Sequence, residues 1–301
     1  MNWLILLIAS VVGAGAYFIY EKPIEIQEPI IANLPQETQE EISISMLPEK
    51  VEQGDPVLIT INGTTTVESL KLNGKALKTF MHNGKLSALV GIDLRSSLGS
   101  FPMVLTLKDG RTVSGKFAVG ERYIAKAPLG IPEKLGGDTP EAEKELISTL
   151  VEEGKLISAV PTANEKLWEG KFRLPINPPI VITDTYGYSR VTGSSNISHK
   201  GTDFRAKVGT PVYAMNSGKV VFARFLRNYG HTVIIDHGFG LHTIYMHLSE
   251  ISVPLNKEVK KGELIAKSGD TGYVLGPHLH LSVRIGGISI DPEKFLEILG
   301  E

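Results

Sequence analysis

Two histidines near the C-terminus, His278 and His280, have the spacing of a small metal or acid–base site. Residues 276–283 read GPHLHLSV, a Gly-Pro turn followed by apolar and β-branched residues, which predicts the start of a strand. Alternate residues of a strand face the same way, so the two imidazoles lie on one face, ~6.6 Å apart along the strand. One ring can then bind a metal while the other acts as a base. Two partly buried strand histidines with polar partners give the same spacing, so the pair does not decide between these alternatives.

The other histidines favour a shared site. Seven of the eight in the chain fall between His199 and His280. Residues 198–204, SHKGTDF, add His199 and Asp203 on either side of a glycine, which lets the backbone turn tightly so that both side chains converge. His199, Asp203 and His280 then form a three-ligand set with an open fourth position, as in catalytic zinc sites. Zinc in such a site lowers the pKa of water to about 7 for attack on a carbonyl.

Two further histidines are candidates for acid–base work beside such a metal. His278 shares a strand face with His280, which places it to act as general base. His247 ends the predicted strand at residues 242–247 and is a second candidate, for acid–base work or for support of a developing oxyanion.

Three motifs together resemble the M23 family of zinc metallopeptidases, also called LytM or lysostaphin-type peptidases. They are HxxxD at 199–203, YMHLS at 245–249 and GPHLH at 276–280. The likeness extends over roughly residues 181–292 and includes GTPV at 209–212 and SGDTG at 268–272. It implies one Zn²⁺ per chain bound by His199, Asp203 and His280, with His278 and His247 as the catalytic pair. It also implies that the chain cuts peptide cross-links of peptidoglycan.

Two residues are candidates for contact with substrate. Arg190 stands where relatives of this family often carry an arginine near the first ligand, and it either orients substrate or pairs with a carboxylate. Tyr245 either lines the groove or packs in the core. The three remaining histidines of the cluster have no expected role beyond hydrogen bonds or solvation at strand ends: His231, His237 and His242.

Composition limits the classes of function. The formal net charge is −2, so nothing indicates binding to nucleic acid through phosphate contacts. The chain has no cysteine, which excludes disulfides and thiolate ligands, so a transition metal must be held by histidine and carboxylate.

Residues 3–20 carry no charge and are just long enough to span a bilayer as a helix. They indicate either an uncleaved membrane anchor or a signal peptide cut after Ala14-Gly15-Ala16. We favour the anchor, because no Lys or Arg precedes the apolar run and the run continues past the small residues. Both interpretations export the rest of the chain. Residues 21–41, rich in Pro, Glu and Gln, are expected to be a spacer leading away from the membrane.

The rest of the chain is predicted to be mostly β. Residues 42–120 hold short alternating runs separated by Asn-Gly and Asp-Gly, the strongest hairpin signals, and predict a small β-sandwich. Residues 121–170 predict a helical connector, with a helix that begins near Asp138-Thr139-Pro140. Residues 171–301 predict an antiparallel β peptidase domain of the LytM type that ends in a short helix.

These observations predict a zinc endopeptidase of the cell envelope, anchored in the membrane with its catalytic domain outside the cytoplasmic membrane. The alternative from another class is a non-enzymatic regulator that binds cell wall or activates a separate hydrolase. All three predicted ligands and both catalytic histidines are present in this chain, which favours the enzyme. A protease that acts on proteins instead of peptidoglycan stays open, because specificity depends on loops that the motifs do not include.

Overall fold

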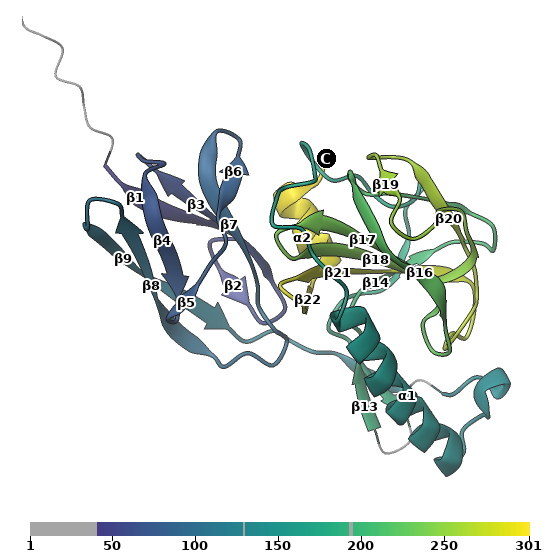
Figure 1. Cartoon of the computed structure of the whole chain (residues 1–301). Coiled ribbons are helices and arrows are strands. Elements are labelled where there is room, and N and C mark those ends of the chain that lie inside the picture. Colours follow the sequence, from purple (N-terminus) through teal and green to yellow (C-terminus); the bar gives the residue numbers. More distant parts are fainter. Residues whose placement is uncertain (1–40, 129, 193–194) are drawn as a thin grey trace, which may run out of the picture. The chain divides into compact units, whose positions relative to one another are not determined.

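The computed structural model describes residues 41–128, 130–192 and 195–301 (Figure 1). The apolar segment at residues 3–20 and nearly all of the predicted spacer lie outside these residues. Among the helices that are described, none combines the length and the apolar character needed to cross a membrane. The fold is mostly β, as predicted, with 47% strand and 12% helix.

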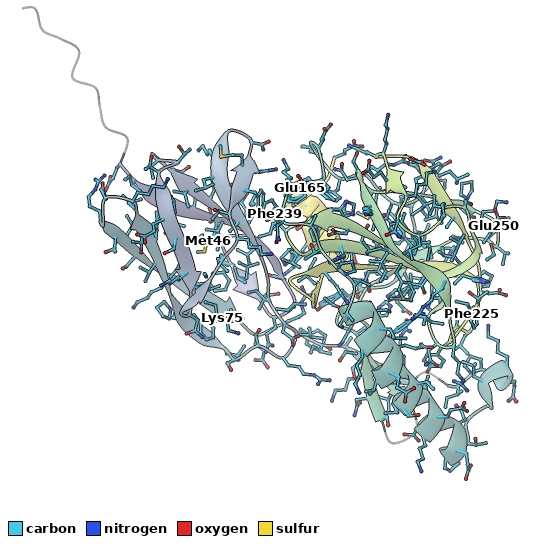
Figure 2. The ribbon with its side chains drawn as sticks, in the orientation of Figure 1. Met46, Lys75, Glu165, Phe225, Phe239 and Glu250 are labelled. Carbon is cyan, nitrogen blue, oxygen red and sulfur yellow. The ribbon has the colours of Figure 1, made fainter. Side chains whose placement is uncertain are left out.

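Residues 43–120 form two sheets that enclose one apolar core. The first sheet has the strand order β1 (Ser43–Leu47), β3 (Pro56–Asn62), β7 (Lys85–Gly91) and β6 (Phe80–His82). The second has the order β2 (Val51–Glu52), β9 (Thr112–Gly120), β8 (Gly99–Leu107), β4 (Val67–Leu72) and β5 (Lys75–Ala76). Buried side chains from both sheets form the core, and Met46 of β1, labelled in Figure 2, packs against it.

The turn residues explain the register of these sheets. Asn73 and Gly74 have φ values of 48° and 76° between β4 and β5, and Asn83 and Gly84 have φ values of 49° and 75° between β6 and β7. Both pairs therefore adopt the two left-handed positions of a tight hairpin, which asparagine and glycine tolerate best. The hairpins predicted at Asn73-Gly74 and Asn83-Gly84 are confirmed, whereas Asn62-Gly63 lies between β3 and β4, which belong to different sheets.

The described part of the connector contains the short strand β10 (Lys126–Pro128), a 3₁₀ turn η1 (Glu133–Leu135) and the helix α1 (Pro140–Ser158). Thr139 caps α1, since its hydroxyl accepts a hydrogen bond from the amide of Ala142, and Pro140 supplies the first helical residue. A three-stranded sheet lies in the order β10, β12 (Ser189–Thr192) and β13 (Ser195–Ser198).

A ten-stranded sheet carries the predicted site. Its main path is β11 (Ile182–Asp184), β14 (Thr202–Arg205), β21 (His278–Ile285), β18 (Leu241–Ile251), β17 (Gly230–Gly238), β16 (Gly218–Leu226) and β19 (Glu258–Val259). Beside this path lie β15 (Pro211–Tyr213), β20 (Leu264–Ser268) and β22 (Ile288–Ile290). All its strand pairs are antiparallel.

The two faces of this sheet are covered differently. One face packs into the largest apolar core, which includes Leu281 of β21 and Phe295 of the C-terminal helix α2 (Pro292–Leu299). The opposite face carries Ile244 and Met246 of β18, which pack with Ile157 near the end of α1. Residues 40–301 form one compact unit, so the predicted boundaries at residues 120 and 170 stay predictions.

Candidate metal and catalytic site

The three side chains that the sequence predicts as metal ligands meet between β14 and β21. Asp203 and His280 are paired directly across the two strands, and His199 lies just before β14. Asp203 Oδ1 lies 3.0 Å from His199 Nε2 and 2.7 Å from His280 Nδ1, and the two ring nitrogens are 3.0 Å apart. All three residues are buried. The structure thus brings one atom of each predicted ligand to a single point.

The outer hydrogen bonds of the two rings determine which nitrogen faces that point. His199 Nδ1 lies 2.8 Å from the carbonyl of Thr185, which can only accept, so the proton is on Nδ1 and Nε2 presents a lone pair. His280 Nε2 lies 3.1 Å from Ser282 Oγ, which itself donates to the carbonyl of Lys200, so Nδ1 presents the lone pair of the second ring.

Two imidazole lone pairs and a carboxylate oxygen therefore face one another at about 3 Å. A bound cation relieves the repulsion among them, and outer hydrogen bonds of this kind are the usual way in which ligand rings are oriented. The donor set of two nitrogens and one oxygen suits zinc. The residues present fit the metal that the sequence predicts.

Gly201 is required for close approach. A Cβ atom at this position would lie 2.5 Å from His280 Nε2 and would also overlap the carbonyl oxygen of Leu281. The sequence predicted that this glycine allows a tight turn between His199 and Asp203. The structure gives a different reason, since there is no room for a side chain between the first ligand segment and β21.

Arg190 pairs with the carboxylate of Asp203. Its guanidinium donates from Nη2 to Asp203 Oδ2 at 2.8 Å and approaches Asp184 Oδ2 at 3.3 Å. Burial opposes ionisation of Asp203, but the neighbouring His280 and His199 outweigh it and hold its pKa well below the usual range. Of the two roles predicted for Arg190, pairing with a carboxylate is the one visible in this structure, while its buried Nε has no hydrogen-bond partner.

His278 begins β21 and presents one free ring nitrogen toward the cluster. Its Nδ1 lies 2.9 Å from the carbonyl of Gly276, which places the proton on Nδ1. Its Nε2 is buried, has no hydrogen-bond partner and lies 3.7 Å from Asp203 Oδ2. An unpartnered acceptor beside the predicted ligands is what a general base requires.

His247 reaches the site through an irregularity in β18. Its φ of 59° is unusual for a residue other than glycine, and the pairing of β18 with β17 shifts register at this point. The ring centroid of His247 lies 5.0 Å from that of His278 and 5.8 Å from that of His280. His247 Nδ1 lies 2.9 Å from the carbonyl of Thr271, so Nε2 is the free acceptor. Burial, with the positive charge that His278 and His280 can carry, holds the pKa of His247 well below its usual value.

Tyr245 does not line the groove. Its side chain is fully buried in the core on the other face of the sheet, opposite Leu281. Its hydroxyl accepts a hydrogen bond from the amide of Met215 at 2.9 Å and lies 3.0 Å from Thr243 Oγ1. Of the two alternatives for Tyr245, packing in the core is the one that the structure shows. A regular strand would direct Tyr245 and His247 to one face, and the irregularity at His247 separates them.

The three histidines without a predicted role have hydrogen-bond or ring partners away from the cluster. His237 is completely buried between the carbonyl of Ser217 and Thr243 Oγ1. His242 Nε2 lies 3.1 Å from the carbonyl of Pro161, and His231 packs edge-on against Phe225.

A cavity of about 570 Å³ lies beside the cluster, between α1 and the face of the sheet that carries the histidines. His199, His247 and His280 line it at one side, and Leu150 and Val151 of α1 line it at another. In Figure 1 α1 lies next to β13, which also contributes to the cavity. The helix predicted only as a connector is therefore a wall of the candidate site.

Several polar residues of this cavity were not predicted from the sequence, among them Lys200, Tyr229, Ser282 and Arg284. The alternation of β21 could have found two of them, because Ser282 and Arg284 share the face of His280. Lys200 directly follows the first ligand. No pattern in the sequence singles out Tyr229, whose place depends on how β16 and β17 connect.

Residues 197–292 match the sequence profile of Peptidase family M23. The chain is 31% identical to the peptidoglycan DD-endopeptidase ShyB of Vibrio cholerae over 58% of this chain and 41% of the relative. It is 39% identical to lysostaphin of Staphylococcus simulans over 38% of this chain and 25% of that protein. The chain thus spans less than half the length of these two relatives.

A solved structure resembles most of this chain. It is that of a putative peptidase M23 from Pseudomonas aeruginosa, 25% identical, with a TM-score of 0.55 over 85% of this chain and 92% of the other. The similarity therefore includes more than the residues that match the family profile.

Proposed function

The chain belongs to peptidase family M23, and from this premise we propose that it is a zinc-dependent endopeptidase that cleaves peptide cross-links of peptidoglycan. One zinc ion per chain is held by His199, Asp203 and His280. The observation that supports this most strongly is the convergence of three buried ligand atoms. Hydrogen bonds to the outer nitrogen of each imidazole ring orient both rings toward this point. The names of the similar proteins supply the substrate class.

When bound, zinc polarises the scissile carbonyl and lowers the pKa of water at the open position. The side chains of the site then handle protons. His278 Nε2 has a lone pair and no partner, so it accepts the proton of the attacking water. The carbonyl of Gly276 holds the other side of the ring, so the imidazolium that forms keeps its orientation.

His247 has a related task. Its depressed pKa keeps the ring neutral, and the bond from Nδ1 to Thr271 makes Nε2 an acceptor in the resting site. It can therefore orient water together with His278. The predicted support for an oxyanion requires a donor, which this ring becomes only after it has taken up a proton.

The proposal also places the chain in the cell envelope, anchored through residues 3–20 with its site outside the cytoplasmic membrane. An apolar N-terminal segment followed by a Pro- and Glu-rich stretch supports this placement. A fixed extracytoplasmic polymer is a suitable substrate for an anchored enzyme.

A digest of purified peptidoglycan with the full-length protein, analysed by mass spectrometry, tests the function. We expect new amine and carboxyl ends at peptide cross-links, and their loss after treatment with a chelator. His278→Ala should retain zinc but cleave at least ~100-fold more slowly, because it removes only the proton acceptor. Intact peptidoglycan after incubation with zinc-loaded wild type would refute the proposal in favour of the regulator, and undiminished turnover by the variant would remove His278 from its role.

A further inference from the structure

The cavity beside the metal cluster is lined by cations without matching acids. Within the described part of the chain, its lining includes five cationic side chains and no aspartate or glutamate: Arg95, Lys155, Arg190, Lys200 and Arg284. The whole chain carries a net charge of −2, so this positive lining is a local feature and not a reflection of composition. Only Arg190 among the five has its charge matched within the site, by Asp203 and Asp184.

Arg284 is the most constrained of these cations. It lies on β21, four residues after His280 and on the same face, about 13 Å along the strand. Its Nη1 donates to Ser158 Oγ at the end of α1 at 3.0 Å, while its buried Nε has no hydrogen-bond partner. No carboxylate pairs with it among the residues that the structure describes. A guanidinium taken out of water without an anion is unfavourable, and burial accordingly lowers the pKa of Arg284.

Lys200 supplies a second cation on the same side of the cavity. It follows the ligand His199, and its carbonyl accepts a hydrogen bond from Ser282, which lies between His280 and Arg284 on β21. The charges of Lys200 and Arg284 interact, while Asp93, the acid that also acts on Lys200, does not line the cavity. Two neighbouring cations on the cavity wall make a binding place for an anion.

The rest of the cavity defines what else the ligand contains. Apolar side chains of Ile147, Leu150 and Val151 on α1 and Met246 on β18 line the same cavity as the two cations and the histidines of the metal cluster. They suit small apolar groups such as the methyl groups of alanine. A short peptide strand with small side chains and a free carboxylate matches both parts of the lining.

We propose that Arg284 and Lys200 form a carboxylate-binding subsite, which holds a free carboxylate of the peptide strand while the scissile bond lies at the metal cluster. This inference rests on the proposed peptidase function and specifies its substrate: cross-linked peptides with unmodified carboxylates, in preference to those in which the carboxylates are amidated. Arg284 offers a planar fork of donors for bidentate binding, and Lys200 adds a second charge.

The test compares one cross-linked peptide dimer, prepared from peptidoglycan, with the same dimer after conversion of its carboxylates to carboxamides. Wild type should have a kcat/KM roughly ten- to hundredfold higher for the acid, mainly through KM, since a charge-assisted hydrogen bond contributes this much. Arg284→Gln should bring the two substrates close to equal, and Arg284→Lys should retain part of the preference. Arg111→Gln, at an exposed arginine of the β8–β9 hairpin, is the matched control and should behave as wild type.

A structural role of Arg284 alone would reduce cleavage of both dimers equally and leave their ratio unchanged, which would overturn the proposal. Lys200→Gln provides the second test if Arg284→Gln does not fold, and it should also reduce the preference for the acid.

Calorimetric binding of both dimers to wild type separates the failure of the subsite from the failure of the peptidase function. If neither dimer is cleaved, the peptidase function fails, and tighter binding of the acid would still support the subsite. Equal binding would refute it.

Discussion

At the scale of single residues, the site depends on backbone positions as much as on side-chain types. His247 reaches the cluster only because its φ is positive and β18 is irregular there. Strained backbone of this kind persists where the surrounding structure holds it, and it is frequent at functional sites. Two hydrogen bonds hold His247 in this conformation. Its Nδ1 donates to the carbonyl of Thr271, and its amide donates to the carbonyl of Tyr229.

A buried histidine outside the cluster gives a prediction for pH. Burial lowers the pKa of His237 to about 4 from 6.5. The folded ring therefore stays neutral where the unfolded ring binds a proton, so its contribution to stability is complete above pH 6.5 and is lost as the pH falls toward 4. We expect His237 to lower the free energy of unfolding by about 2 kcal/mol between pH 7 and pH 5.

Urea unfolding of the zinc-loaded protein at these two pH values measures this effect. His237→Gln removes the titrating group, so wild type should lose about 2 kcal/mol more than the variant over the same interval. Equal losses in the two proteins would show that His237 is not the group responsible.

At the scale of elements, local turn and cap chemistry was predictable from the sequence. The Asn-Gly pairs fix hairpins because few other residues accept φ > 0 twice, and Thr139-Pro140 begins α1 as expected. The order of the three motifs along the chain also led to the ligand cluster. For this cluster, spacing alone left open whether the histidines form a metal site or are ordinary strand histidines. The resemblance to a family favoured the metal site.

Other features depend on tertiary contacts and could not be predicted. The apolar positions of α1 indicate that one face is buried, but not that Leu150 and Val151 lie over the histidine cavity. Regular alternation in β18 would put Tyr245 and His247 on one face, and a single irregularity separates them. Such an irregularity has no signature in this sequence, since His247 is neither glycine nor asparagine.

At the scale of the whole molecule, one arginine joins segments that are far apart in the chain. Arg122 donates to Asp55 Oδ1 at 2.8 Å, to Asp291 Oδ2 at 2.9 Å and to the carbonyl of Gln53 at 2.7 Å. Asp55 lies between β2 and β3, and Asp291 caps α2. The guanidinium of Arg122 therefore joins the turn before β3 to the last helix. Both carboxylates are nearly inaccessible to solvent.

Removal of this arginine should therefore destabilise the protein strongly. Arg122→Ala leaves Asp291 without its cation and is expected to lower the free energy of unfolding by about 3 kcal/mol, as for other broken buried pairs. Arg111→Ala breaks an exposed pair with Asp109 and should cost less than about 1 kcal/mol. Chemical denaturation of both variants gives the comparison. Similar small losses in both would show that the Arg122 contacts do not stabilise the fold.

One zinc ion is proposed to be bound by His199, Asp203 and His280. The most direct measurement is the zinc content per chain of purified wild type and of the single variants His199→Ala, Asp203→Ala and His280→Ala, with His231→Ala as the matched control. We predict close to one zinc in wild type and the control, and loss of most of it in each ligand variant, because each removes one of three converging donors. Equal zinc content in all five proteins would show that these three residues do not hold the metal.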